Sequence, residues 1–193
     1  MRKGIDSLCS VVRSDLGLPS GTKWASCNVG ATKPEECGGY FAWGETVEKN
    51  DYDWETYAYC DGDEDSCHDL GSDIAGTKYD VAHVKWGGNW RMPTFEQIRE
   101  LLDNCPTEWI EINGVKGCKF SSKINGNSIF LPAAGRRYVS DLFNAGSYGF
   151  YWFSTQYLSY SSGAHGLYFC SGGTGWHHGY RRNGRSVRPV VRN

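Results

Sequence analysis

The chain has 193 residues, which is enough for one domain with a substantial hydrophobic core. Aromatic residues make up 15% of it, including eight Trp, and this content excludes a disordered chain. The formal net charge of −2 gives no sign of a nucleic-acid partner, and no apolar run is long enough for membrane insertion.

The cysteine content is even, at eight, which suits an extracellular protein with some disulfides. No pair shows the C-x-x-C spacing of a zinc site. Cys60 and Cys67 share one polar loop and are the pair most readily expected to be joined. Residues 1–13 contain no apolar run of signal-peptide length, so we expect release without a signal peptide, or a natural start elsewhere.

The N-terminal part predicts a lead-in followed by short elements. Residues 1–14 are expected to be flexible, and residues 15–193 to form a single domain. Residues 15–25 predict a strand, a Pro-Gly turn and a second strand. A short helix or single turn is expected at 33–38, and an aromatic strand-like run at 40–45.

Residues 46–79 are polar and acidic and predict a long irregular excursion. Within it, residues 61–65 resemble the start of a calcium loop. The EF-hand pattern needs Gly and Glu at its sixth and twelfth positions, where this chain has Ser66 and Ser72. We therefore expect a solvated acidic loop, with a weak irregular calcium site as the alternative, and no other metal or cofactor.

The clearest predicted helix begins after Thr94, a good N-cap whose capping box is completed by Gln97. Ile98, Leu101 and Leu102 share one apolar face, and a Cys-Pro pair ends the helix. If the ring of the preceding Trp90 is buried, its replacement by alanine should cost about 3–5 kcal/mol.

Short strands are expected at residues 109–110, 118–120 and 129–131, with Asn-Gly turns between them. The chain shows no internal repeat and no linker. The predicted fold class is therefore α+β, with few short helices around small antiparallel sheets and long irregular loops.

Residues 151–192 have an unusual composition. They contain no Asp, Glu or Lys, five Arg give a positive balance, and Tyr, Ser, Gly and His dominate the rest. Tyr supplies stiff contact area while Ser and Gly supply adaptable hydrogen bonding, as in antibody binding loops. A glycine-rich terminal hairpin with solvated polar residues is the alternative. The aromatic density and the absence of acids favour a binding surface.

The apolar pattern of residues 167–170 alternates, which predicts a strand with one buried face. A second strand is expected within 186–191, joined to the first by a Gly-rich turn region at 172–184. The supports expected to be buried are Trp152, Leu167, Phe169 and Val187. The residues expected on the displayed face are Tyr168, Cys170, His177, His178, Tyr180 and Arg182.

Short motifs in one fixed order cover nearly the whole chain from Asp15 onward. Each is weak alone, but together they are specific: residues 15–24 (DLGLPSGTKW), 40–45 (YFAWGE), 82–88 (AHVKWGG), 90–94 (WRMPT), 130–135 (FLPAAG), 146–149 (GSYG) and 186–190 (SVRPV). This set resembles the Fibrobacter succinogenes major paralogous domain family. The resemblance implies a C-type lectin-like fold, related to that of formylglycine-generating enzymes, in a bacterial or phage protein.

Some members of that family are variable proteins of diversity-generating retroelements, in which adenine-directed mutagenesis rewrites the 3′ end of the gene. Ordinary members are often rich in Asn across the stretch matching residues 157–183. Changing the two adenines of an Asn codon can give Ser, Gly, Tyr, His, Cys, Arg or Phe. Such residues occur at Tyr157, Tyr160, Ser162, Gly163, His165, Gly166, Tyr168, Cys170, His177, His178, Gly179 and Tyr180. Gln156 and Trp176 cannot arise by this route and are assigned to fixed sequence.

The resemblance and the composition together predict a receptor or adhesin-like protein that binds a protein or glycan ligand at a cell or phage surface. Its expected location is extracellular, on a cell surface or on a phage particle, with no oligomeric state assigned. The predicted contact residues are Phe153, Tyr157, Tyr160, Ser162, His165, Tyr168, Cys170, His177, His178, Tyr180, Arg182 and Arg185.

Two alternatives stay open. Formylglycine-generating enzymes resemble the chain at residues 90–94 and 188–190, but their chemistry relies on two cysteines acting on copper, and this region offers only Cys170. We therefore expect no enzyme activity. Calcium-independent sugar binding is the second alternative, because the Glu-Pro-Asn, Gln-Pro-Asp and Trp-Asn-Asp signatures of calcium-dependent lectins are missing. Adjacent His177 and His178 point to opposite faces of a strand and rarely chelate one metal.

Overall fold

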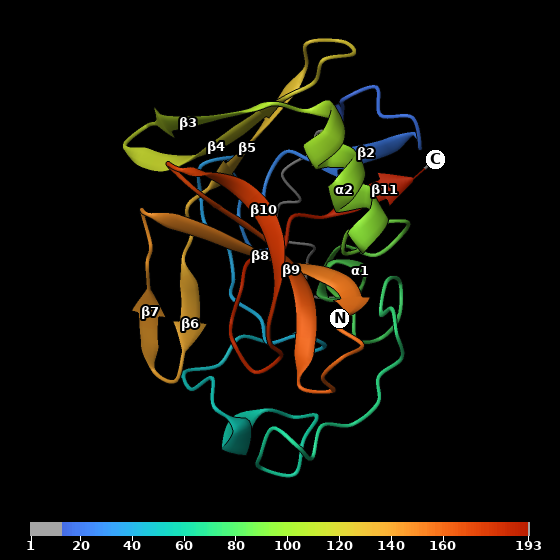
Figure 1. Ribbon diagram of the computed structural model, residues 1–193, viewed down its shortest axis with the longest axis vertical. Helices are drawn as coiled ribbons and strands as arrows, with labels where there is room; N and C mark the ends of the chain where they lie inside the picture. Colours follow the sequence, from blue (N-terminus) through green and yellow to red (C-terminus); the bar gives the residue numbers. More distant parts are fainter. Residues whose placement is uncertain (1–12, 193) are drawn as a thin grey trace, which may run out of the picture.

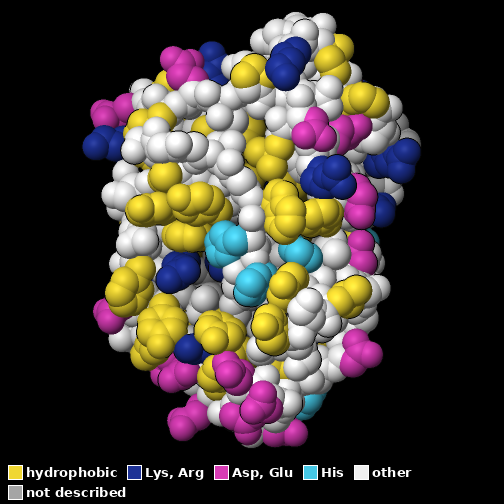
Figure 2. Space-filling model, viewed as in Figure 1, with side chains coloured by type: hydrophobic (Ala, Val, Ile, Leu, Met, Phe, Trp, Pro, Cys, Tyr) yellow, Lys and Arg dark blue, Asp and Glu magenta, His cyan; other side chains and the backbone are white. Residues whose placement is uncertain are grey.

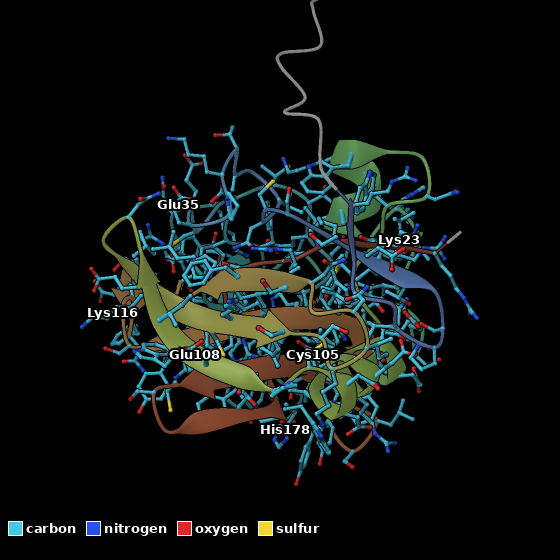
Figure 3. All side chains as sticks on the ribbon, turned by 90° about the horizontal axis from the view of Figure 1, so that it is seen from above. Lys23, Glu35, Cys105, Glu108, Lys116 and His178 are labelled. Atoms are coloured by element: carbon cyan, nitrogen blue, oxygen red, sulfur yellow. The ribbon has the colours of Figure 1, made fainter. Side chains whose placement is uncertain are left out.

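A three-stranded antiparallel sheet carries most of the C-terminal stretch (Figure 1). It contains β8 (Tyr148–Gln156), β9 (Gly163–Cys170) and β10 (Gly173–Tyr180), in the order β10-β9-β8, and is called the display sheet below. The computed structural model describes residues 13–192. Seen from above, the display sheet carries His178 on the side of the molecule opposite Glu35 (Figure 3).

The predicted alternation in β9 is confirmed, because Leu167 and Phe169 are fully buried while Tyr168 and Cys170 are half-buried. The predicted turn at 172–184 is wrong. Most of it is strand β10, which pairs along its whole length with β9, and the reversal is confined to the two residues between them. The glycines that indicate a turn in the sequence serve a packing role, described below.

The remaining strands form three small antiparallel sheets. They are β1 (Arg13–Asp15), β2 (Thr22–Ala25) and β11 (Val190–Arg192), in the order β1-β2-β11; β3 (Thr107–Ile112), β4 (Val115–Ser121) and β5 (Ser128–Pro132); and β6 (Arg136–Tyr138) with β7 (Asp141–Phe143). Part of the predicted lead-in, Arg13 and Ser14, belongs to β1, and the rest lies outside the described residues. Because β2 pairs with both β1 and β11, strands from the two ends of the described chain belong to one sheet.

Helices are few. The predicted helix is α2 (Phe95–Asn104), and both bonds of its capping box are present: Thr94 Oγ1 accepts from the Gln97 N–H at 3.3 Å, and Gln97 Oε1 from the Thr94 N–H at 3.0 Å. A second helix, α1 (Val81–Trp86), was not predicted; buried Asp80 caps it. Small antiparallel sheets with few helices confirm the α+β class.

The core lies on both faces of the display sheet. On the inner face, Tyr151, Phe153, Leu167 and Phe169 pack in one cluster with buried residues of α2, β4 and β5. On the other side, Trp152 packs with Trp43 and Val187. All four predicted supports, Trp152, Leu167, Phe169 and Val187, are fully buried, which confirms them.

Residues 46–79 form the predicted irregular excursion, interrupted only by a 3-10 turn, η1 (Trp54–Thr56). The expected Cys60–Cys67 disulfide is wrong, because both thiols are free and Cys60 Sγ donates to the Trp54 carbonyl at 3.1 Å. Burial raises the pKa of Cys67 to about 11, so its thiol stays protonated. No helix within residues 13–192 has the length and apolar character needed to cross a bilayer.

Candidate ligand-binding site

The outer face of the display sheet carries a row of rings. Directly opposed residues of antiparallel strands point to the same side, so the pairs Tyr148–Cys170 and Phe150–Tyr168 share this face. The ring centroids of Phe150 and Tyr168 are 6.0 Å apart, and His177 is 5.9 Å from each. Figure 2 shows His side chains near the centre of the molecule on this side, with hydrophobic side chains around them. Three predicted contact residues, Tyr168, Cys170 and His177, thus lie together.

A second cluster of rings lies on the face of β10 opposite to His177. His178 stacks on Tyr157 with 4.2 Å between centroids and 6° between planes. His165 lies 5.1 Å from Tyr157 and 5.9 Å from Trp176. The prediction that His177 and His178 share one displayed face is therefore wrong, because neighbours on a strand alternate between its two faces.

Two predicted contact residues belong to the interior. Phe153 is fully buried in the core cluster and cannot touch a ligand. Arg182 is also buried, and its Nη1 donates to Asp53 Oδ1 at 3.0 Å and to the Tyr52 carbonyl at 3.3 Å. The position of Phe153 next to the binding stretch and the charge of Arg182 each indicate a surface residue. Both predictions are wrong because the residues that bury these two side chains come from distant segments of the chain.

The most exposed Tyr and Trp rings of the region are those of Tyr160, Trp176 and Tyr180, at 61%, 49% and 46%. Trp176 was not among the predicted contact residues, because it cannot derive from an Asn codon. Its exposure follows from its position on the edge strand β10, opposite Leu167. Only recognition of β10 as a strand could have revealed it.

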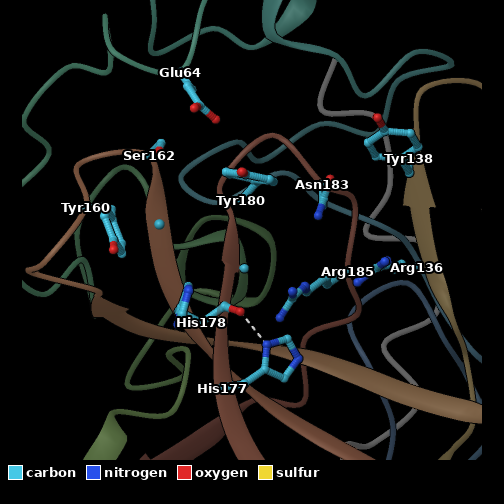
Figure 4. Close-up of a pocket in the computed structure, with 12 residues that line it drawn as sticks. Glu64, Arg136, Tyr138, Tyr160, Ser162, His177, His178, Tyr180, Asn183 and Arg185 are labelled. Atoms are coloured by element: carbon cyan, nitrogen blue, oxygen red, sulfur yellow. Dashed lines mark hydrogen bonds between the residues drawn. The ribbon is translucent and has the colours of Figure 1, made fainter.

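A hollow of about 550 Å³ opens beside the outer face, between β9, β10 and the segment that follows them (Figure 4). We call it the arginine hollow. The predicted contact residues that line it are Tyr160, Ser162, His177, His178, Tyr180 and Arg185. The lining side chains that the prediction missed are Glu64, Arg136, Tyr138 and Asn183. Glu64, Arg136 and Tyr138 lie outside the Gly- and Tyr-rich stretch of residues 151–192. Asn183 lies within it, but nothing in the composition marks it as a contact residue.

The positive balance of residues 151–192 is largely internal. Of the five arginines, only Arg192 is exposed. Arg181, Arg182, Arg185 and Arg188 are all buried. The expected cationic contact surface is therefore absent from this part of the described chain, and Arg185 contributes to the site only through the wall of the hollow.

Arg185 lies flat against the display sheet. Its Cζ is 4.0 Å from the centroid of the Trp152 ring and 5.5 Å from that of Phe150. Gly166 and Gly179 leave the room that the guanidinium occupies, because a Cβ on Gly179 would come within 1.7 Å of Arg185 Nη2 and one on Gly166 within 2.4 Å of Nη1. These glycines are thus strand residues that accommodate a side chain from above.

His177 is a neutral hydrogen-bonding group in this wall. Burial and the nearby Arg185 lower its pKa to about 4, so the ring is uncharged at neutral pH. Its Nδ1 contacts the carbonyl oxygen of His178, drawn as a dashed line in Figure 4. A carbonyl oxygen only accepts, so Nδ1 carries the proton and Nε2 is left as an acceptor.

Cys170 lies at the far end of the ring row. Hydrogen bonds from the Tyr168 hydroxyl and from the Gly172 N–H lower the pKa of its thiol below the usual value. Among residues 13–192, the His, Cys, Asp and Glu side chains form no group of three that could hold a metal ion. In the acidic loop, Asp63 Oδ1 instead accepts from the N–H groups of Asp65 and Ser66. The absence of catalysis and of a cofactor stays a prediction.

Comparison with known proteins gave no match to a family model, to a curated protein or to a solved structure. The resemblance to the Fibrobacter succinogenes major paralogous domain family therefore rests on the sequence motifs alone.

Proposed function

We propose that this protein binds a ligand, as a receptor or adhesin-like protein of a bacterium or phage, through a C-terminal face whose side chains are diversified on a fixed backbone. We further propose a C-type lectin-like fold, which the small sheets and the long irregular excursion support. The expected site of action is outside the cell, on a cell surface or phage particle, and the expected partner is a protein or a glycan.

One observation carries the proposal: the positions between 157 and 180 assigned above to altered Asn codons and the side chains that support the fold occupy different places. Of the nine non-glycine positions of that type, eight are exposed or half-buried, and Ser162 is the exception. The supports Trp152 and Val187 lie in the core instead. Changes at the first set can alter binding while the second set maintains the backbone, which reduces the ordering cost on binding.

The exposed chemistry also suits a protein or glycan better than a nucleic acid. Tyr160, Trp176 and Tyr180 offer large rings of the kind that dominate protein interfaces. Nucleic-acid binding depends on accessible Lys and Arg that neutralise phosphates. Within residues 151–192, the arginines other than Arg192 are buried, so they present no exposed cationic surface to a phosphate backbone.

Deep sequencing of the 3′ end of this gene in a natural population is the direct test of diversification. We expect substitutions to concentrate between residues 157 and 180, at adenine-rich codons, and to spare the fully buried Trp152, Leu167, Phe169 and Val187. An invariant region, or changes scattered evenly along the gene, would contradict diversification and leave a single dedicated ligand.

Replacing Tyr168 and Tyr180 together by alanine should weaken binding while changing the free energy of unfolding by only about 1 kcal/mol, because neither ring belongs to the core. The matched control is Phe153→Ala on the same sheet, whose fully buried ring should cost about 3–5 kcal/mol. Urea unfolding measures stability, and a glycan array and a peptide display library measure binding. A double variant that unfolds like Phe153→Ala would place these tyrosines in the core.

A further inference from the structure

The three fully buried arginines of the C-terminal segment differ in their partners. Arg181 donates to the Tyr57 hydroxyl and to the carbonyls of His68 and Ser161, at 2.9 to 3.0 Å. Arg188 donates to four oxygen atoms, at 2.8 to 3.2 Å. Arg185 is buried just as deeply, yet its Nε, Nη1 and Nη2 have no hydrogen-bond partner among the described residues.

A buried cation without partners is costly, so it requires a reason. The contact with the Trp152 ring at 4.0 Å offsets part of that cost. It satisfies none of the N–H groups, however, because they lie along the edge of the guanidinium plane. The two glycines beneath it show that the sheet is shaped to hold the group where it is. Arg181 and Arg188, in the same segment, show that the fold supplies acceptors to buried arginines that have a structural role.

A second cation lies beside the first. Arg136 has its Cζ 5.0 Å from the Phe150 ring, the same ring that Arg185 approaches at 5.5 Å, and its buried Nε has no partner either. Both arginines line the arginine hollow, and Figure 4 shows them side by side with Arg185 directed into it. Burial and the charge of Arg136 lower the pKa of Arg185 to about 9, so Arg185 remains charged at neutral pH.

No acid of the described chain forms an ion pair with either cation. The one acidic lining residue, Glu64, lies across the hollow from Arg185 (Figure 4). The other walls are neutral: the rings of Tyr138 and Tyr180, the acceptor Nε2 of His177 and the amide of Asn183. The hollow therefore combines two unpaired guanidinium groups with apolar and hydrogen-bonding walls.

We propose that the arginine hollow binds a carboxylate group of a small organic acid or of an acidic unit on a larger ligand, held by Arg185 and Arg136. A guanidinium presents its N–H groups in a plane that matches a carboxylate, often with two parallel bonds. The volume of about 550 Å³ suits a small ligand whose carbon body lies among the tyrosine rings. This names the ligand chemistry of part of the proposed binding face, so it rests on that proposed function.

Matched pairs of probes test the proposal by calorimetry and by thermal unfolding of the full chain. Glucuronate with glucose represents a sugar source, and N-acetylglutamate amide with N-acetylglutamine amide represents a peptide source. We expect one or both acids to bind and to raise the unfolding temperature, and each neutral counterpart to bind at least about tenfold more weakly. The acid that binds more tightly identifies the source.

Arg185→Met is the decisive variant. It removes an unpaired buried charge, so it should unfold at the same temperature as the wild type or higher, while affinity for the acid falls about tenfold or more. Arg185→Lys keeps the charge without the planar fork and should lose affinity partially, which provides a second reading should the Met variant not fold. Arg192→Met, which removes an exposed arginine that does not line the hollow, should bind the acid as the wild type does.

Equal binding of acid and neutral probes, wild-type binding by both Arg185 variants, or no binding of either acid at roughly 10 mM would overturn the proposal. Tighter binding of inorganic phosphate than of both acids would overturn the assignment to a carboxylate. None of these results bears on diversification, which the population sequencing tests separately.

Discussion

Replacing Arg188 by leucine is expected to destabilise the protein by about 3–5 kcal/mol, the range found when one partner of a buried charged contact is removed. The side chain is 1% exposed, and its Nε donates to Asn28 Oδ1 at 2.8 Å. Its Nη atoms donate to the backbone carbonyls of Ala25, Ser26 and Phe130. Leucine would fill part of the space but would leave these buried acceptors without donors, at about 1–3 kcal/mol for each that stays unsatisfied.

Urea unfolding of the Arg188 variant measures the effect, with Arg192→Leu as the control. Arg192 is exposed and donates only to the Ser20 carbonyl, at 3.1 Å, so its loss should cost about 0.5–1 kcal/mol. Arg185→Met should show no loss at all, since the side chain of Arg185 has no hydrogen bond to lose. If Arg188→Leu and Arg192→Leu unfolded at the same urea concentration, the contacts of Arg188 would not contribute to stability.

Trp152→Ala is expected to cost about 3–5 kcal/mol as well, for a different reason. The ring is fully buried in one cluster with Trp43 and Val187, and its Nε1 donates to the Phe41 carbonyl at 2.8 Å. Its removal would open a cavity, leave that carbonyl without its side-chain donor and remove the surface on which Arg185 lies. The variant should therefore lose both stability and the ordered wall of the arginine hollow.

Trp176→Ala is the matched control, because it removes the same ring from the same sheet at a position that is 49% exposed. We expect it to cost about 1 kcal/mol or less in the same urea titration. Similar losses for the two variants would mean that burial does not determine the cost.

The cost of about 3–5 kcal/mol predicted for Trp90→Ala required a buried ring. Trp90 is only half-buried and packs edge-on against Trp86, with 5.3 Å between ring centroids, so that requirement is not met.

Local patterns were sufficient for several elements. The capping box of Thr94 and Gln97 and the apolar face that follows predict α2, because a helix end and a helical face are encoded within a few residues. The alternation around Leu167 and Phe169 predicts β9 in the same way, since the period of two belongs to the strand itself. The buried supports and the irregular excursion of residues 46–79 could also be predicted from composition.

Strand β10 and the arginines show where local patterns were insufficient. As a residue type, Gly179 indicates a turn, yet it lies in strand β10. Its lack of a side chain leaves room there for the guanidinium of Arg185. The arginines indicate a cationic surface by type, yet Arg188 is buried because Asn28, 160 positions away in the chain, supplies an acceptor. Whether a charge is buried and paired, or buried and left facing a hollow, depends on partners that only the tertiary structure brings together.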